Sequence, residues 1–161
     1  MIRPVILLLL IVLLNTGNTA AQQPSLTVYN YYGEKGRDSH STSETISING
    51  STVSYSVKYT GRRAPEQESE EKTCTLTSEQ LKQIYKTIIE KQLNVTDSVV
   101  ILQKETGGTE VTAVVGITVT IAGKTTKTKC KGAPSDLAHK PLYDNSLYLF
   151  RQIKSMVGLC R

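Results

Sequence analysis

Residues 44–59, which read ETISINGSTVSYSVKY, decide the fold of this chain. Two runs alternate between apolar and polar side chains, and Asn49-Gly50 separates them. Asn-Gly favours the positive backbone angles of a type I′ turn, so the pattern predicts a β-hairpin. In this register Ile46 lies opposite Val53, and one face of the hairpin is apolar. That face comprises Ile46, Ile48, Val53, Tyr55, Val57 and Tyr59.

A helix entry follows at residues 76–81, which read LTSEQL. Thr77 has the position of an N-cap, Gln80 completes a capping box, and the two leucines form a hydrophobic staple. Apolar residues then recur at helical spacing, which predicts an amphipathic helix that ends near Leu93 and packs on the sheet. Its apolar face comprises Leu81, Ile84, Tyr85, Ile88 and Ile89.

The remaining elements surround this unit. Residues 26–32 predict a first strand, residues 111–121 a central strand buried on one side, and residues 125–130 an edge strand of alternating Thr and Lys. A second amphipathic helix is predicted from about Asp144. The fold class is therefore α+β, with an antiparallel sheet of about five or six strands and two amphipathic helices packed on one face.

The start of the chain predicts a signal peptide over residues 1–21, with Arg3 before an apolar run and small residues at its end. The run from Val5 to Leu14 is shorter than the roughly 20 residues of a membrane-spanning helix. Residues 22–161 then form a single α+β domain that is secreted or periplasmic, with no transmembrane segment.

The formal net charge of the whole chain is +5, and removal of Arg3 reduces it by one. Because this charge is mild and dispersed, a nucleic-acid partner is not expected. Lys127, Lys129 and Lys131 would share one face of a strand, and a solvated face is favoured over an anion-binding patch.

Three cysteines in an oxidising compartment predict one disulfide and one unpaired thiol. Cys74 and Cys130 both end apparent strands and are the favoured pair. A bridge from Cys130 to Cys160 is the second choice. A reactive role for the remaining thiol is disfavoured, because no cysteine has a base nearby in the sequence.

No catalytic, cofactor-binding or metal-binding set is found. The sequence has no HExxH or CxxC motif and no phosphate-binding loop. His40 lies in the segment Asp38-Ser39-His40-Ser41, which is expected to be a surface loop rather than an active site, since triad members meet through the fold. His139 is expected to be a surface side chain.

The order of strand, hairpin, Leu76–Leu81 helix entry, the strands from Val111 to Cys130 and a closing helix resembles emfourin-type domains. Domains of that bacterial family inhibit thermolysin-like metalloproteases. The resemblance implies a protease inhibitor, and it identifies no inhibitory residue in this chain.

The sequence therefore favours a secreted or periplasmic non-enzymatic module that presents the polar stretches Gly33–Ser43 and Gly61–Lys72 to a protein partner. Two alternatives stay open. One is a secreted hydrolase or small-ligand-binding domain with a histidine in a cleft, and the other is a structural cell-envelope protein linked through a free cysteine. The candidate partner-binding residues are Arg37, Asp38, His40, Arg62, Arg63 and Glu66.

Overall fold

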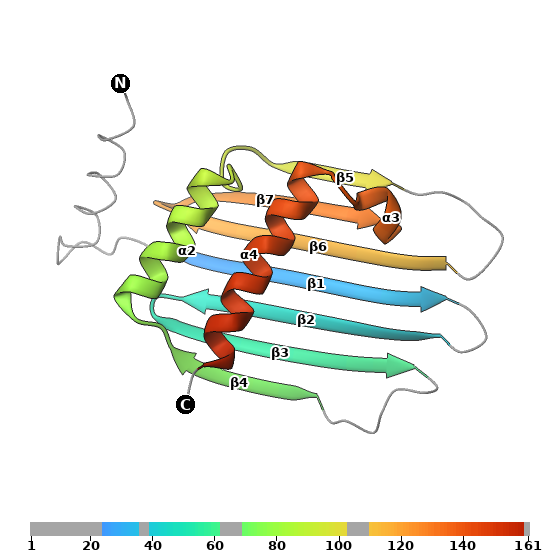
Figure 1. Ribbon diagram of the computed structural model, residues 1–161. Helices are drawn as coiled ribbons and strands as arrows, with labels where there is room; N and C mark the ends of the chain where they lie inside the picture. Colours follow the sequence, from blue (N-terminus) through green and yellow to red (C-terminus); the bar gives the residue numbers. More distant parts are fainter. Residues whose placement is uncertain (1–23, 36–38, 62–68, 103–109, 160–161) are drawn as a thin grey trace.

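A computed structural model describes residues 24–35, 39–61, 69–102 and 110–159 (Figure 1). The predicted signal peptide lies outside the described residues. The same holds for five of the candidate partner-binding residues: Arg37, Asp38, Arg62, Arg63 and Glu66.

The described residues form one sheet of seven strands, with order β4-β3-β2-β1-β6-β7-β5. All neighbouring strands are antiparallel except β5, which runs parallel to β7. The strands are β1 (Ser25–Lys35), β2 (His40–Asn49), β3 (Thr52–Gly61), β4 (Glu70–Thr75), β5 (Ser98–Leu102), β6 (Glu110–Ile121) and β7 (Lys124–Gly132).

The predicted mixture of sheet and helices is confirmed, but the predicted sheet was too small and wrongly all antiparallel. The difference comes from β5, whose short apolar sequence does not reveal a pairing partner. By adding to the sheet beside β7, β5 makes β7 an internal strand, so the prediction of an edge strand at residues 125–130 was wrong.

The helices are α2 (Ser78–Glu90), the short α3 (Pro134–Leu137) and α4 (Pro141–Gly158). Helices α2 and α4 both lie across the same face of the sheet (Figure 1). Helix α4 starts at Pro141, a few residues before the predicted Asp144, because proline suits the first helical turn. Together the two long helices cover the apolar face of β1, β2, β3 and β6.

The capping box at the start of α2 is confirmed. The Gln80 backbone N–H donates to Thr77 Oγ1 at 3.2 Å, and the Thr77 N–H donates to Gln80 Oε1 at 2.8 Å. These bonds satisfy donors that the first turn would otherwise leave open. They fix where the chain leaves β4 and enters the helical layer.

The turn of the β2–β3 hairpin differs from the prediction. Asn49 pairs with Thr52, so the two turn residues are Gly50 and Ser51 rather than Asn49 and Gly50. Gly50 has a φ of 59°, and Ser51 is not in the positive region. A glycine alone at the first central position is the pattern of a type II′ turn, which suits a hairpin as well as type I′ does.

This turn changes the register of the hairpin without changing its faces. Val53 pairs with Ile48, and Ile46 pairs with Tyr55, so the predicted Ile46–Val53 pair is wrong. The shift is by two residues along one strand, and side chains alternate with a period of two. Five of the six residues predicted to share the apolar face are accordingly buried, and Tyr59 packs against them.

Much of the predicted polar loop at residues 33–43 is strand. β1 continues to Lys35, and β2 begins at His40. Because β1 is the central strand, it pairs with β2 on one side and β6 on the other along this polar stretch. Backbone hydrogen bonds on both sides stabilise strand structure that the side chains do not signal.

The cysteines lie far apart in the sheet. Cys74 is in edge strand β4 and Cys130 is in β7, five strand positions away. At about 4.8 Å per position this is roughly 24 Å, whereas disulfides join Cα atoms about 4.4–6.8 Å apart. Cys130 is a free thiol, 1% exposed. Both predicted pairings that use Cys130 are therefore wrong.

We expect Cys74 to pair with Cys160, the pairing that three cysteines leave, although Cys160 lies outside the described residues. Cys74 packs against the core cluster that contains Met156 and Val157, and these two residues lie in the last turn of α4. Peptide mapping of the oxidised protein without reduction should yield a Cys74–Cys160 linked peptide. Cys130 should react with a thiol reagent only after unfolding, and any linked peptide containing Cys130 would contradict this assignment.

Candidate functional site

The face of the sheet opposite α2 and α4 carries no described helix (Figure 1). Alternate residues of each strand point to this face, so the strand registers identify its side chains. On β1 they include Tyr29 and Tyr31, since Leu26 and Val28 are buried under the helices. We call this surface the open face. Most of its other side chains carry hydroxyls: Thr27, Ser43, Thr45, Ser47, Ser54, Ser56, Thr73 and Thr118.

A stripe of positive charge crosses the open face along β7. Lys127, Lys129 and Lys131 all point to it, because Lys129 shares a cross-strand row with Gly116 and Tyr29. The sequence predicted that the three lysines share one face of a strand. Within the described part of the chain, none of the three forms an ion pair. We call these residues the lysine stripe.

One acid, Asp97, lies close to the lysine stripe but forms no ion pair with its three lysines. Asp97, which precedes β5, accepts a hydrogen bond from the backbone N–H of Lys127 at 2.7 Å. Its carboxylate thus serves the backbone rather than a lysine ammonium group. The open face also carries an acid on β4, at the other edge of the sheet. This acid is Glu71.

The tyrosines of β1 give the open face its apolar area. A Cβ added to Gly33 would lie 2.2 Å from the Tyr31 hydroxyl, so the ring of Tyr31 extends along β1 and covers this glycine. At Gly116, beside Tyr29, an added Cβ would meet only the Thr128 carbonyl oxygen, at 3.6 Å. The surface beside Tyr29 is therefore open, and tyrosine is a side chain that suits both apolar and polar contact.

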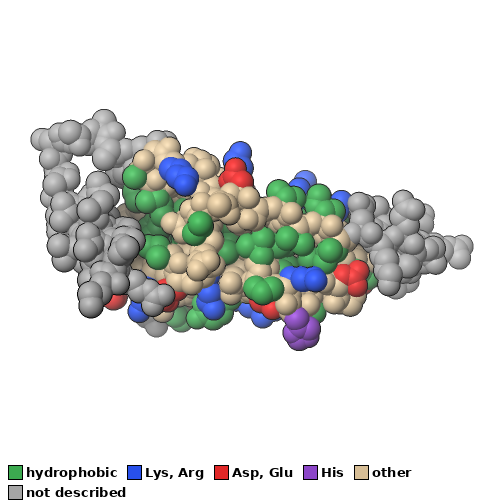
Figure 2. All heavy atoms as spheres, turned by 90° about the horizontal axis from the view of Figure 1, so that it is seen from above, with side chains coloured by type: hydrophobic (Ala, Val, Ile, Leu, Met, Phe, Trp, Pro, Cys, Tyr) green, Lys and Arg blue, Asp and Glu red, His purple; other side chains and the backbone are tan. Residues whose placement is uncertain are grey.

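The edge of the open face at β5 is apolar. Val99 is 65% exposed and Ile101 is 55% exposed. They lie in the same cross-strand rows as Lys129 and Lys131, respectively. Figure 2, which looks onto this side of the molecule, shows hydrophobic side chains gathered along its middle, with basic side chains beside them.

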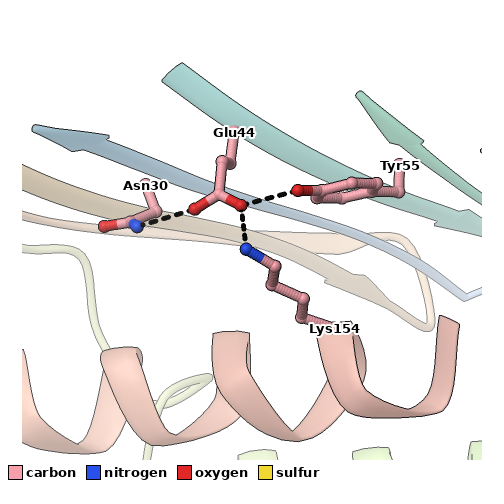
Figure 3. A network of polar contacts seen from close by, with 4 residues as sticks. All are labelled: Asn30, Glu44, Tyr55 and Lys154. Carbon is pink, nitrogen blue, oxygen red and sulfur yellow. Dashed lines mark hydrogen bonds and ion pairs between the residues drawn. The ribbon is translucent and has the colours of Figure 1, made fainter. Parts of the chain in front are cut away.

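A second polar group lies on the helix-covered face, around Glu44 of β2 (Figure 3). Glu44 is 8% exposed. Its carboxylate accepts one hydrogen bond from the Tyr55 hydroxyl at 2.6 Å and another from Asn30 Nδ2 at 3.3 Å. It also forms an ion pair with Lys154 of α4. These residues come from three adjacent strands and from the helix that crosses them.

The charge states in this network are set by burial and by the partners. Burial acts to raise the pKa of the Glu44 carboxyl, but the hydrogen bonds from Lys154 and Tyr55 and the charge of Lys154 outweigh it and lower the pKa. Burial, and then the hydrogen bond to Glu44, raises the pKa of Tyr55. Glu44 is thus an anion and Tyr55 a neutral donor at neutral pH, which is the arrangement of a stable contact rather than of an acid–base pair.

The geometry of Lys154 indicates a structural role. Its ammonium group lies 5.6 Å from the centroid of the Tyr55 ring and 5.9 Å from that of Phe150, so it is held by two aromatic rings as well as by Glu44. Both carboxylate oxygens of Glu44 accept hydrogen bonds from protein donors (Figure 3). The network therefore attaches α4 to the sheet at one defined position.

Replacing Lys154 by Met should destabilise the fold by about 1–2 kcal/mol. This is less than the roughly 3–5 kcal/mol of a fully buried pair, because Lys154 is nearly half exposed. Urea unfolding at neutral pH measures the difference. In the matched control, Lys86→Met breaks the exposed Lys86–Glu90 pair and should cost less than about 0.5 kcal/mol.

The same pair predicts an acid dependence. The lowered pKa of Glu44 contributes stability that is fully present above its unfolded-state pKa, and this stability is lost as the pH falls through the folded-state pKa. Glu44→Gln should therefore be destabilised at neutral pH and should lose less stability than the wild type on acidification. Parallel unfolding curves for the two proteins at every pH would contradict this.

Both histidines are exposed. His40 is exposed at the start of β2, with Nδ1 3.6 Å from Glu34 Oε2. Its neighbour Ser41 points to the opposite face of the sheet, so the hydroxyl and imidazole of this segment are not brought together. His139 is exposed in the turn between α3 and α4, with a φ of 65°.

Burial alone shifts the pKa of two further side chains, Cys130 and Tyr85. Burial raises the pKa of the Cys130 thiol to about 11, so it is protonated and unreactive at neutral pH. Burial also raises the pKa of the Tyr85 hydroxyl to about 12. In the described ranges no group of three His, Cys, Asp or Glu side chains is placed to hold a metal ion. Nor does any described helix have the length and apolarity needed to cross a membrane.

Comparison with protein-family models gives no match, and comparison with curated proteins gives none either. The resemblance to emfourin-type domains therefore stays a prediction.

The sequence identified the shared face of the three lysines but missed the Glu44 network. A signal was present, because Glu44 has the same alternation as Ile46 and Ile48 and so places a carboxylate on an apolar face. Its partner Lys154 lies 110 residues away, and nothing local connects the two.

Proposed function

We propose that this protein is a secreted or periplasmic, non-enzymatic binding module that holds an acidic protein partner against its open face. The observation that carries the proposal is the lysine stripe: three lysines on one strand face, with no ion pair among the described residues, next to half-buried tyrosines and to hydroxyls. Such a surface offers charge, amphipathic rings and hydrogen-bonding groups without a cleft.

The surface differs from the one that the sequence favoured. The polar stretch after Gly33 is largely strand, and of the candidate loop residues only His40 is described. The strand ends next to the undescribed connections, such as Lys35, His40 and Gly61, lie at one end of the sheet. The lysine stripe runs toward this same end at Lys131 and Gly132, so partner contact there would be continuous with the open face.

The charge chemistry supports a protein partner with surface carboxylates. Each exposed lysine–carboxylate contact contributes about 0.2–1 kcal/mol, so three of them change affinity measurably but cannot supply it all. Hydroxyl and tyrosine contacts would supply the rest. Binding of this kind should weaken as salt rises, because the contacts are at the surface.

The test compares two triple variants with equal loss of charge. Lys127, Lys129 and Lys131 are changed to Ser in one, and Lys82 and Lys86 of α2 and Lys91 at its C-cap, on the helix side, are changed to Ser in the other. A protein retained from secreted and envelope extracts by the wild type is purified and titrated against all three. We expect the open-face variant to bind it roughly tenfold more weakly or worse, and the α2 variant to bind as the wild type does.

Three results would contradict the proposal. Equal binding by both variants would place the contact elsewhere, and equal weakening by both would indicate nonspecific attraction to net charge. Tighter binding of a DNA duplex than of any retained protein would point to a nucleic-acid partner instead.

A further inference from the structure

The two edges of the sheet are built differently. Edge strand β4 carries Glu70, Glu71 and Lys72, all exposed. Charged side chains on an edge discourage the pairing of another strand. Edge strand β5 is Ser98-Val-Val-Ile-Leu102 and has no charge at all. Among the described residues, no strand pairs with the outer side of β5. This edge therefore has both unpaired backbone groups and exposed apolar side chains.

We infer that β5 pairs with β5 of a second copy of this chain, and that the two sheets join into one across a two-fold axis. An antiparallel pair centred on Val100 places Val99 of each copy directly opposite Ile101 of the other. Both side chains point to the open face, where they are 65% and 55% exposed. The strand is thus complementary to itself, which is what a two-fold interface requires.

The other face of β5 also fits this arrangement. Val100 and Leu102 point to the helix side, where they pack against the cluster that contains Cys130 and Leu137. They are only partly buried there. A second β5 would add apolar cover along this side too, so both faces of the joined strands would gain contacts.

Electrostatic repulsion does not oppose the pairing. In the joined sheet, the β7 strands of the two copies are three strand positions apart, about 14 Å at about 4.8 Å each. This is longer than the Debye length of about 8 Å at physiological salt, so the two lysine stripes are largely screened from each other. On edge strand β4, by contrast, the exposed charged side chains discourage pairing with another strand.

Pairing through β5 would double the area of the open face. Two lysine stripes would lie on one continuous surface, on either side of the apolar Val99 and Ile101 cluster. This inference rests on the β5 edge alone and does not depend on the proposed acidic partner.

The test measures the mass of the protein by sedimentation. It uses the chain from residue 22 onward, which contains the whole described fold. We expect a dimer that forms reversibly within about 10 μM to about 1 mM, the range of small transient interfaces. Val99→Lys/Ile101→Lys places like charges opposite each other and should raise the dissociation constant roughly tenfold or more. Val95→Lys is the matched control, because Val95 is 53% exposed but lies outside β5.

Hydrogen exchange on the wild type keeps the test decisive if the double variant folds poorly. The amides of residues 98–102 should exchange more slowly at high than at low protein concentration, while those of β4 should not change. A monomer throughout this concentration range, a dimer retained by the folded double variant, or a dimer that reduction dissociates would each overturn the inference. Failure of these tests leaves the lysine-stripe experiment unaffected, because that experiment measures partner binding.

Discussion

The structure depends on the burial of one face of the central strands under α2 and α4. Isoleucine, leucine and valine side chains from β1, β2, β3 and β6 meet those of the two helices in one cluster. Each such side chain contributes about 1.5–3 kcal/mol when fully buried, so this layer outweighs any single polar contact. Because both long helices use the same face, the chain must cross the sheet on that side after β4, and it returns at the opposite edge as β5. The uncovered face and the parallel β5 edge are both consequences of this arrangement.

Within that apolar layer, the Glu44 network supplies position rather than bulk stability. An apolar contact between a helix and a sheet tolerates sliding, whereas a buried carboxylate has a few discrete donors. Lys154 reaches Glu44 from one turn of α4, and its ammonium group lies near the rings of Tyr55 and Phe150. A displacement of α4 by one turn would leave Glu44 without its cation at a buried site. We interpret the network as the contact that selects one placement of α4 among similar apolar alternatives.

The elements that the sequence predicted well are those whose signals are local. The capping box of Thr77 and Gln80 and the buried apolar face of β6 depend on residues a few positions apart, although Val114 and Thr120 show that β6 is also buried on its other face. The predicted hairpin register was wrong by two residues because Asn49-Gly50 and Gly50-Ser51 are both acceptable turns, and the local sequence does not choose between them. The partner of β5, the separation of Cys74 from Cys130, and the Glu44–Lys154 pair depend on strand order, which no short pattern contains. The lysine stripe is intermediate between these cases. The spacing of the three lysines predicted that they share a face, but it could not predict which face of the sheet this is or which residues lie beside them.

The side chains that the sheet exposes to solvent differ between the two halves of the open face and between its two edges. A sheet face that merely needs solvation can be made of hydroxyls throughout, as the β2 and β3 part of the open face largely is. On the β7 side, the same face changes to lysines that form no ion pair with the described residues, and then to exposed valine and isoleucine at the edge. Exposed apolar side chains on an unprotected edge favour unwanted strand pairing, and β4 shows that this chain can protect an edge with charge. The absence of such protection at β5, in the rows that also hold Lys129 and Lys131, is most simply explained if this half of the surface is covered when the protein functions.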